Sequence, residues 1–267
     1  MVELLLILDG ASEAPEAPRQ SLELATTPHL DRLTLAGSRE WTQLLPEGVP
    51  VGSETAIAAL LGWTTDGPVD RGAVEAAARG LELTVGQRAW RIDIGSRPHL
   101  QKLILVGGQE APVISSKGPI RIWPAGQIPP RILDHRTVVI GAAGAATGLG
   151  RLMGAQVVIP AGATGRPGSD LAAKREAALA AIAAGANRVV IHVGGADEAA
   201  HARDRAAKIA VLEEADRQLT GPLAEALAGH GGTFTVCPDH GCDPESGQHI
   251  GGPVPVVRWQ TTATRGA

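Results

Sequence analysis

Aspartate and histidine residues recur where short apolar segments of the chain end, and these side chains are the ones best suited to chemistry. The set comprises Asp9 after LLLIL, Asp197 and His201 in GGADEAAH, Asp239 and His240 after TFTVCP, and His249 in GQHIGG. Any one of them alone would be a turn former or a hydrogen-bonded polar residue. Carboxylates and imidazoles in this mixture suit Zn²⁺ or Mn²⁺. Two such ions would stabilise both ends of an in-line phosphoryl displacement.

One serine is placed to supply a nucleophile to such a site. Ser53 stands in VPVGSETAIAALLGW, between a Pro-Val-Gly bend and a helix-forming apolar run. Serine is a preferred N-cap because its oxygen satisfies an unpaired backbone N–H, and caps far outnumber nucleophiles. A helix N-terminus also stabilises the anion formed when a phosphate is attacked. The stretch by itself leaves both roles open, and one residue can fill both.

Bringing these residues together requires strands that end at one edge of a sheet. Apolar runs alternate with Ala-rich ones, which predicts strands at 3–9, 188–194 and 233–239 and helices at 27–37, 170–184 and 206–231. Such alternation is typical of a parallel sheet with helices on both faces. Ligands bind these sheets beyond the carboxyl ends of the strands. The polar residues described above follow the predicted strands at that edge.

Residues 71–136 differ in composition from the rest of the chain. They hold ten Lys or Arg against five Asp or Glu, a net charge of +5. Strand-like pieces at 82–93, 102–108 and 119–123, among scattered Gly and Pro, predict a small β-rich insertion. We therefore expect a core made of residues 1–70 and 137–267, with 71–136 as an inserted cap. Its basic surface is either simply solvated or faces an anionic substrate.

The overall composition narrows the class of protein. The chain has 267 residues, 44% of them hydrophobic, but one Phe and no Tyr, so Ala, Leu, Val and Ile must form the core. A net charge of −4 argues against nucleic-acid binding by the protein as a whole. No apolar run is long enough for a membrane span and MVELLLILDG lacks a basic leader, so we expect a cytoplasmic protein with no membrane partner. Cys237 and Cys242 are too few for a disulfide scaffold, which leaves them a minor metal or redox role. The sequence does not indicate an oligomeric state.

The order of the motifs resembles that of the alkaline phosphatase superfamily: LILDG, TPHLDRL, GSETA, ADEAAH, PDHG and QHIGGPVPV. More narrowly, the chain resembles archaeal-type cofactor-independent phosphoglycerate mutase, through RGAVEAAARGLEL, AWRID, IWPAGQIP, GLGRLMGAQVVIPAGATG and Lys174. The resemblance extends over almost the whole chain. It implies an α/β fold with a three-layer α/β/α core around a mostly parallel sheet, and a small basic cap inserted into it.

The resemblance also implies roles for individual residues. One metal ion would be held by Asp197, His201 and His249, and the other by Asp9, Asp239, His240 and the hydroxyl of Ser53. The ions would be Mn²⁺ or Zn²⁺, with Mg²⁺ as a further possibility. Metal coordination would lower the pKa of Ser53, which takes a phosphoryl group and returns it to another oxygen of the bound acid. Arg71, Arg91 and Lys174 would bind the carboxylate or phosphate of a small phosphorylated acid, or else they are solvated surface side chains.

Three features depart from the family pattern. The insertion is shorter, it lacks the Arg-Ala-Gly-Arg stretch of the family, and the chain ends soon after PVPVVRWQ. A mutase must keep the dephosphorylated acid in a closed site until it turns over, whereas phosphoserine chemistry does not need a cap. Three functions follow: interconversion of 3- and 2-phosphoglycerate, which the family likeness favours; a phosphohydrolase of a small phosphorylated or phosphonate metabolite; and a catalytically silent metal-binding scaffold that binds a partner.

Overall fold

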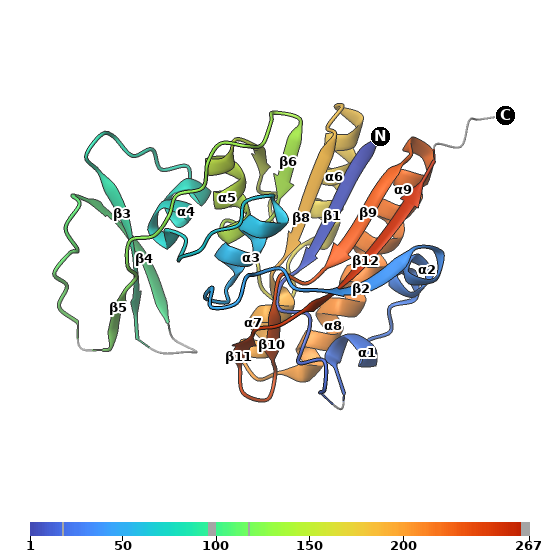
Figure 1. Cartoon of the computed structure of the whole chain (residues 1–267), viewed down its shortest axis with the longest axis horizontal. Coiled ribbons are helices and arrows are strands. Elements are labelled where there is room, and N and C mark those ends of the chain that lie inside the picture. Colours follow the sequence, from blue (N-terminus) through green and yellow to red (C-terminus); the bar gives the residue numbers. More distant parts are fainter. Residues whose placement is uncertain (18, 96–99, 117, 263–267) are drawn as a thin grey trace.

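A seven-stranded sheet forms the centre of the molecule, in the order β2-β12-β9-β1-β8-β6-β7. The computed structural model describes residues 1–17, 19–95, 100–116 and 118–262 (Figure 1). The strands are β1 (Val2–Leu8), β2 (Ser38–Thr42), β6 (Thr137–Ile140), β7 (Gln156–Val158), β8 (Arg188–Val193), β9 (Gly232–Cys237) and β12 (Val254–Thr261). Five strands run parallel, from β9 to β7, and β12 and β2 add an antiparallel edge.

Helices cover both faces of this sheet (Figure 1). One face carries α3 (Ser53–Leu60), α4 (Arg71–Ala78) and α5 (Ala145–Met153); the other carries α1 (Ser21–Leu24), α2 (Pro28–Ala36), α6 (Leu171–Ala183), α8 (Arg205–Ala215), a π-helical turn (Asp216–Thr220) and α9 (Gly221–His230). In β1, Leu4 and Leu6 pack with the second group and Leu5 and Ile7 with the first. Successive side chains of a strand point to opposite faces, so an all-apolar β1 fits a sheet buried on both sides. The predicted three-layer α/β/α fold is confirmed.

The helix expected over 206–231 contains the π-helical turn between α8 and α9. Pro222, in the first turn of α9, has no N–H to donate to the preceding turn, so regular α-helical bonding cannot continue there. The wider turn also brings Gly221 against the ring of His29, where a β-carbon would lie 2.6 Å from ring atoms. The helical run from Arg205 to His230 is continuous, as the sequence predicted; the π-helical turn within it was not predicted. No helix among the described residues combines the length and apolar character needed to cross a membrane.

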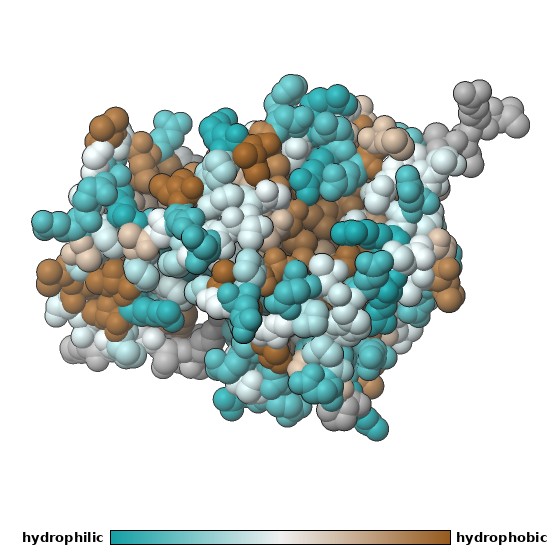
Figure 2. Space-filling view, in the orientation of Figure 1, coloured by the Kyte–Doolittle hydropathy of each residue, from teal (hydrophilic) through white to brown (hydrophobic). Residues whose placement is uncertain are grey.

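The segment 71–136 carries a second, three-stranded sheet beside the first (Figure 1). This cap sheet consists of β3 (Arg88–Ile94), β4 (Gln101–Gly107) and β5 (Ile120–Ile122), antiparallel and in the order β4-β3-β5. Leu103, Leu105 and Val106 of β4 are exposed, and apolar surface is visible at this end of the molecule in Figure 2. The β-rich character is as predicted. Because α4 packs against both α5 and β3, the division at residue 71 stays a proposal.

Two short elements complete the edge at which the parallel strands end. α7 (Gly195–His201) follows β8, and after β9 an antiparallel hairpin pairs β10 (Gly241–Asp243) with β11 (Gln248–Ile250). In Figure 1 both lie below the carboxyl ends of β1, β8 and β9. This edge carries the polar residues that the sequence singled out.

Candidate metal centre

The predicted carboxylate and imidazole ligands come together at this edge. Three overlapping groups, each with ligand atoms within 4.8 Å of one another, are Asp197, His201, Cys242 and His249; Asp9, Asp197 and His240; and Asp9, His192 and Asp239. Gly10 makes the close approach of β1 and α7 possible. It has a positive φ of +63°, and a β-carbon there would lie 2.8 Å from that of Asp197. A side chain at position 10 would push Asp197 away from Asp9.

The first group is centred on Asp197 and His201, which lie one turn apart on α7. His201 Nε2 lies 3.2 Å from Asp197 Oδ2 and 3.0 Å from His249 Nε2. His249 Nε2 lies 3.4 Å from Asp197 Oδ1. The carbonyl oxygen of Gly247 lies 2.8 Å from His201 Nδ1, and because a carbonyl only accepts, it fixes the proton on Nδ1 and leaves Nε2 free to bind a cation.

Asp9, Asp239 and His240 follow the ends of β1 and β9, and we call these three residues the second group. His240 Nε2 lies 3.4 Å from Asp9 Oδ1 and 3.5 Å from Asp239 Oδ2. Asp239 Oδ1 accepts the backbone N–H groups of Gly10 and His240, at 3.1 and 2.9 Å. These bonds leave its other oxygen directed into the site. The ring of His240 lies 4.1 Å from that of His249, so the two groups are neighbours.

Ser53 lies beside the second group. Its Oγ donates a hydrogen bond to Asp9 Oδ1 at 3.4 Å and lies 3.2 Å from His240 Nε2. Of the two roles that the sequence left open for Ser53, the structure does not give it that of N-cap, because Gly52 is the N-cap and α3 begins at Ser53 itself. One residue further along, the hydroxyl points away from the helix axis and toward the metal-ligand candidates. The Ser53 hydroxyl therefore makes no capping hydrogen bond to α3.

Negative charge is concentrated at this edge. Burial, followed by the charges of Asp239 and Asp197, raises the pKa of Asp9 well above its usual value. Burial also acts to raise the pKa of Asp197, but hydrogen bonds from His201 and His249 outweigh it and hold that pKa well below its usual value. Carboxylates this close repel one another, and a cation among them relieves the repulsion.

Three buried polar atoms at this edge make no hydrogen bond of normal geometry and face neighbouring candidate ligands instead. They are Asp197 Oδ1 (3.4 Å from His249 Nε2), Asp239 Oδ2 (3.5 Å from His240 Nε2) and His192 Nε2 (3.2 Å from Asp9 Oδ2). Buried polar atoms are normally hydrogen-bonded, so such atoms call for an explanation. Burial lowers the pKa of His192 to about 4, which keeps its imidazole neutral, the form that binds metals. The residues present therefore fit divalent metal ions, as the sequence predicted.

Two members of the groups were not predicted as ligands. His192 sits within the β8 strand, in RVVIHV, where a lone histidine is more often a core residue. Cys242 directly follows Asp-His-Gly, and its closeness to two predicted ligands was the signal that could have found it. Cys237 lies apart from these groups, in the apolar core. Burial raises the pKa of both thiols, that of Cys237 to about 12.

Arg71 lies close to the serine in the structure. Its guanidinium pairs with Glu54, the residue after Ser53, and lies over the ring of Trp123 at 4.0 Å from the ring centre. About a quarter of the side chain is exposed, 26%. Arg71 begins α4, and its guanidinium reaches Glu54 in the first turn of α3. The contact of Arg71 with substrate stays a prediction.

Arg91 and Lys174 gain no support as substrate ligands. The Arg91 side chain is 3% exposed and pairs with Glu75 and Asp93, so it would have to leave two carboxylates to bind a substrate. Lys174 has no exposed surface, and its Nζ donates to the backbone oxygen of His192 at 2.8 Å. Burial lowers the pKa of Lys174 to about 8. In this structure Lys174 braces the strand that precedes α7.

A cavity of about 210 Å³ opens beside the second group. It is bounded by residues 43–49, Val51, Asp239, His240 and 250–252. Within the described ranges, none of the residues that bound it is Lys or Arg. This cavity gives a small substrate access to Asp239 and His240, without a cation of the protein to meet its carboxylate.

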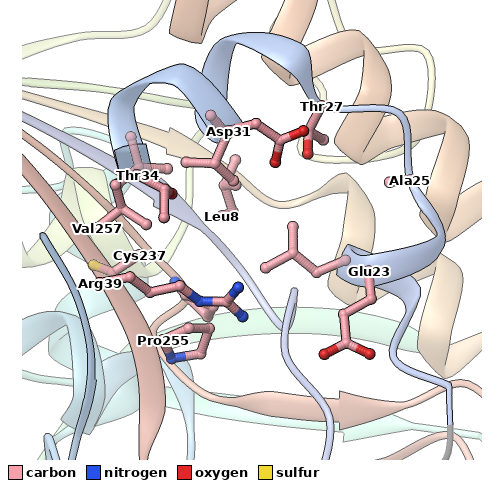
Figure 3. Close-up of a pocket in the computed structure, with 14 residues that line it drawn as sticks. Leu8, Glu23, Ala25, Thr27, Asp31, Thr34, Arg39, Cys237, Pro255 and Val257 are labelled. Carbon is pink, nitrogen blue, oxygen red and sulfur yellow. The ribbon is translucent and has the colours of Figure 1, made fainter. Parts of the chain in front are cut away.

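A second cavity, of about 140 Å³, lies between α2 and the sheet. Figure 3 shows Glu23, Asp31 and Arg39 around it, with Leu8 and Val257 behind. None of the predicted metal ligands lines it. Its mixed charges indicate no particular ligand, so the chemistry belongs to the edge of the sheet.

The fold and the clustered ligands are those of a metal-dependent enzyme. The chain belongs to the Metalloenzyme superfamily, whose family model matches residues 1–266. This membership agrees with the use of divalent metal.

The relatives refine the family. A 2,3-bisphosphoglycerate-independent phosphoglycerate mutase of Methanopyrus kandleri is 33% identical over 127 residues, which are 48% of this chain and 30% of that protein. The 2,3-bisphosphoglycerate-independent phosphoglycerate mutase 1 of Archaeoglobus fulgidus is 24% identical over an alignment of 363 positions. The alignment covers 96% of this chain and 88% of that protein. The solved PH0037 protein from Pyrococcus horikoshii shares the fold, with a TM-score of 0.80, 24% identity and coverage of 97% and 85%. The predicted resemblance to archaeal mutases is confirmed, although the match spans under a third of the first relatives' length.

Proposed function

We propose that this protein is a metal-dependent phosphoryl-transfer enzyme in which Ser53 carries the phosphoryl group. The position of its Oγ, between Asp9 and His240 at the start of α3, is the observation that supports this role. The substrate is a small phosphorylated acid. The favoured reaction interconverts 3- and 2-phosphoglycerate, because curated relatives carry the name phosphoglycerate mutase.

Two divalent ions, Mn²⁺ or Zn²⁺ with Mg²⁺ as a further possibility, fit the two groups of ligands. One ion would be held by Asp197, His201 and His249, and the other by Asp9, Asp239, His240 and Ser53. Bound there, the ions supply positive charge that acidifies the serine hydroxyl and stabilises the oxygens around phosphorus.

The residues of the chain perform the transfer itself. Asp9 accepts the hydrogen bond of the Ser53 hydroxyl, which leaves an oxygen lone pair for attack on phosphorus. As the Ser53 Oγ–P bond forms, the Ser53 O–H bond breaks and its proton passes to Asp9. The substrate P–O ester bond breaks at the same time; its electron pair stays on the substrate oxygen, which then takes up the proton. The N–H groups at the start of α3 favour the negative charge of the phosphorylated serine. In the second half, another oxygen of the bound acid attacks the phosphoserine, and Ser53 is restored.

A phosphohydrolase is the second candidate, and the cavity beside His240 favours it. A mutase must hold a dephosphorylated acid by its carboxylate, but the residues of the described chain that bound this cavity include no Lys or Arg. If the acid leaves early, water attacks the phosphoserine instead, and free phosphate is released. The same serine and the same metal ligands serve both reactions.

The decisive experiment follows both products at once. We would incubate the metal-loaded protein with 3-phosphoglycerate and measure 2-phosphoglycerate and free phosphate together. Formation of 2-phosphoglycerate supports the mutase, phosphate alone supports the phosphohydrolase, and neither product contradicts the choice of substrate.

Ser53→Ala tests the nucleophile. We expect this variant to lose both products and the phosphorylated peptide that mass spectrometry would detect, while it keeps its fold and most of its metal, since the carboxylate and imidazole ligands remain. Ser38→Ala, on the exposed strand β2, is the matched control and should keep full activity. Substantial turnover by Ser53→Ala would mean that water or another residue is the nucleophile.

A further inference from the structure

Cys242 is a member of the metal centre that the proposed reaction does not use. It has no exposed surface, and its sulfur lies within 4.8 Å of ligand atoms of Asp197, His201 and His249. The sulfur is 3.9 Å from His201 Nδ1. Its position thus makes it a neighbour of every predicted ligand in the first group.

The backbone holds Cys242 firmly in this place. In the β10–β11 hairpin it stands directly opposite His249, so the two residues form a cross-strand pair. Its N–H donates to the Ser12 oxygen at 3.0 Å, and its own carbonyl accepts from Lys208 Nζ at 2.7 Å. Lys208 is itself fully buried and paired with Glu13. These backbone hydrogen bonds restrain the position of the Cys242 thiol beside the predicted ligands.

An independent observation indicates that a ligand belongs between these residues. Asp197 Oδ1 is buried, in a residue that is 7% exposed, and it faces His249 Nε2 at 3.4 Å, itself a predicted metal ligand, with no hydrogen bond of normal geometry. A carboxylate oxygen so placed is expected to accept from a donor or to bind a cation. With two imidazoles and a sulfur around it, the group offers four ligand atoms.

We infer that Cys242 is a fourth ligand of the metal site formed by Asp197, His201 and His249, and that its sulfur makes this site selective for zinc. Binding breaks the S–H bond, releases the proton to solvent and forms a zinc–sulfur bond. Soft thiolate ligands favour Zn²⁺, whereas oxygen-rich sites suit Mg²⁺ and Mn²⁺. The group of Asp9, Asp239, His240 and Ser53 offers no sulfur, so the two sites should differ in metal preference. Zinc also accepts a fifth ligand, which leaves room for a phosphate oxygen.

This inference rests on the metal centre of the proposed function but not on the reaction. Its tests therefore read the metal directly, and a protein without mutase or phosphatase activity can still pass them. Failure of the proposed function would be seen as lack of Ser53-dependent turnover in a protein that binds zinc through sulfur.

The first test replaces zinc by Co²⁺, whose spectrum reports sulfur ligation. One equivalent of Co²⁺ added to the full-length protein should produce a near-ultraviolet sulfur-to-metal charge-transfer band. We expect Cys242→Ser to lose that band and to bind Zn²⁺ at least about 10–100-fold more weakly, the loss that even an outer-shell change causes. Its affinity for Mn²⁺ should change less. A variant that keeps both the band and the zinc affinity would overturn the inference.

Cys237→Ser is the matched control, because Cys237 is also buried and free but belongs to none of the metal-ligand groups found among the described residues. It should keep the charge-transfer band. Loss of the band in Cys237→Ser together with retention in Cys242→Ser would overturn the inference.

A measurement on the unaltered protein covers the case in which Cys242→Ser does not fold. X-ray absorption of the protein with one equivalent of Zn²⁺ should show one sulfur neighbour at about 2.3 Å, the usual zinc–sulfur distance. A zinc shell of nitrogen and oxygen alone would mean that Cys242 is a packing residue and that the inference is wrong.

Discussion

The central sheet and the cap sheet are stabilised by different interactions. Leu4 to Leu8 of β1 are all buried between two helix layers, whereas most residues of β4 in the cap are exposed. In the cap, ion pairs take the place of a second apolar layer, as in the pairing of Arg91 with Glu75 and Asp93. Apolar burial is strong and non-directional, while an ion pair contributes only what exceeds its desolvation cost. Most of the stability should therefore reside in the core.

The same division separates the ligands from the cap. Every candidate metal ligand lies on a core element or on the connections around it, and none lies in the cap sheet. The cap approaches the site helix through Lys102, whose Nζ lies 3.9 Å from Glu198 on α7. We therefore expect metal binding to depend on the core, and contact with the substrate to depend on the cap as well.

Phe234→Ala should have the largest effect on stability. This residue is the single Phe of the chain, is fully buried, and sits in β9, the strand that leads to Asp239. Removing so large a side chain from a packed core should lower the free energy of unfolding by about 3–5 kcal/mol. Urea unfolding would measure it, with Phe234→Leu as a control expected to cost less than about 1.5 kcal/mol. A loss below about 1 kcal/mol for the alanine variant would mean that the core is not packed as described.

Arg91→Met should have the next largest effect, confined to the cap. The variant leaves Glu75 and Asp93 close together without their shared cation, which should cost about 3 kcal/mol. Hydrogen exchange should become faster in β3, β4 and β5 but stay unchanged in β1 and β8. Arg121→Met, which alters an arginine over Trp123, is the control and should change little. Equal acceleration in the central sheet would show that cap and core unfold as one unit, against the proposed division.

The fold could be predicted in good part from local pattern. All-apolar runs alternating with Ala-rich helices specify a parallel sheet, and the ends of parallel strands meet at one edge. This is why the six carboxylate and imidazole candidates could be expected together from sequence alone. Asp70 and Asp170, which cap α4 and α6, agree with the ordinary rules for helix starts.

The remaining features depend on contacts between distant residues. At the π-helical turn Gly221 packs against His29, and the burial of Arg91 depends on its pairing with Glu75, which lies on another element. The place of Cys242 opposite His249 follows from the register of a hairpin that the sequence did not mark. The start of α3 could not be predicted to a single residue, and a shift of one residue decides whether the Ser53 hydroxyl caps the helix or faces the metal-ligand candidates.

Leu105→Ser should have the smallest effect, and it tests the comparison from the other side. Leu105 is 42% exposed on β4 and pairs across the cap sheet with Trp90. Because the Leu105 side chain is already largely exposed, the variant should lose only about 0.2–1 kcal/mol, the contribution of one cross-strand contact. Urea unfolding measured as for Phe234→Ala would give both values on one scale. A loss above about 2 kcal/mol would be that of a buried leucine. Another surface would then have to cover β4 in solution, and the cap could no longer be contrasted with the core as the sheet that lacks an apolar layer.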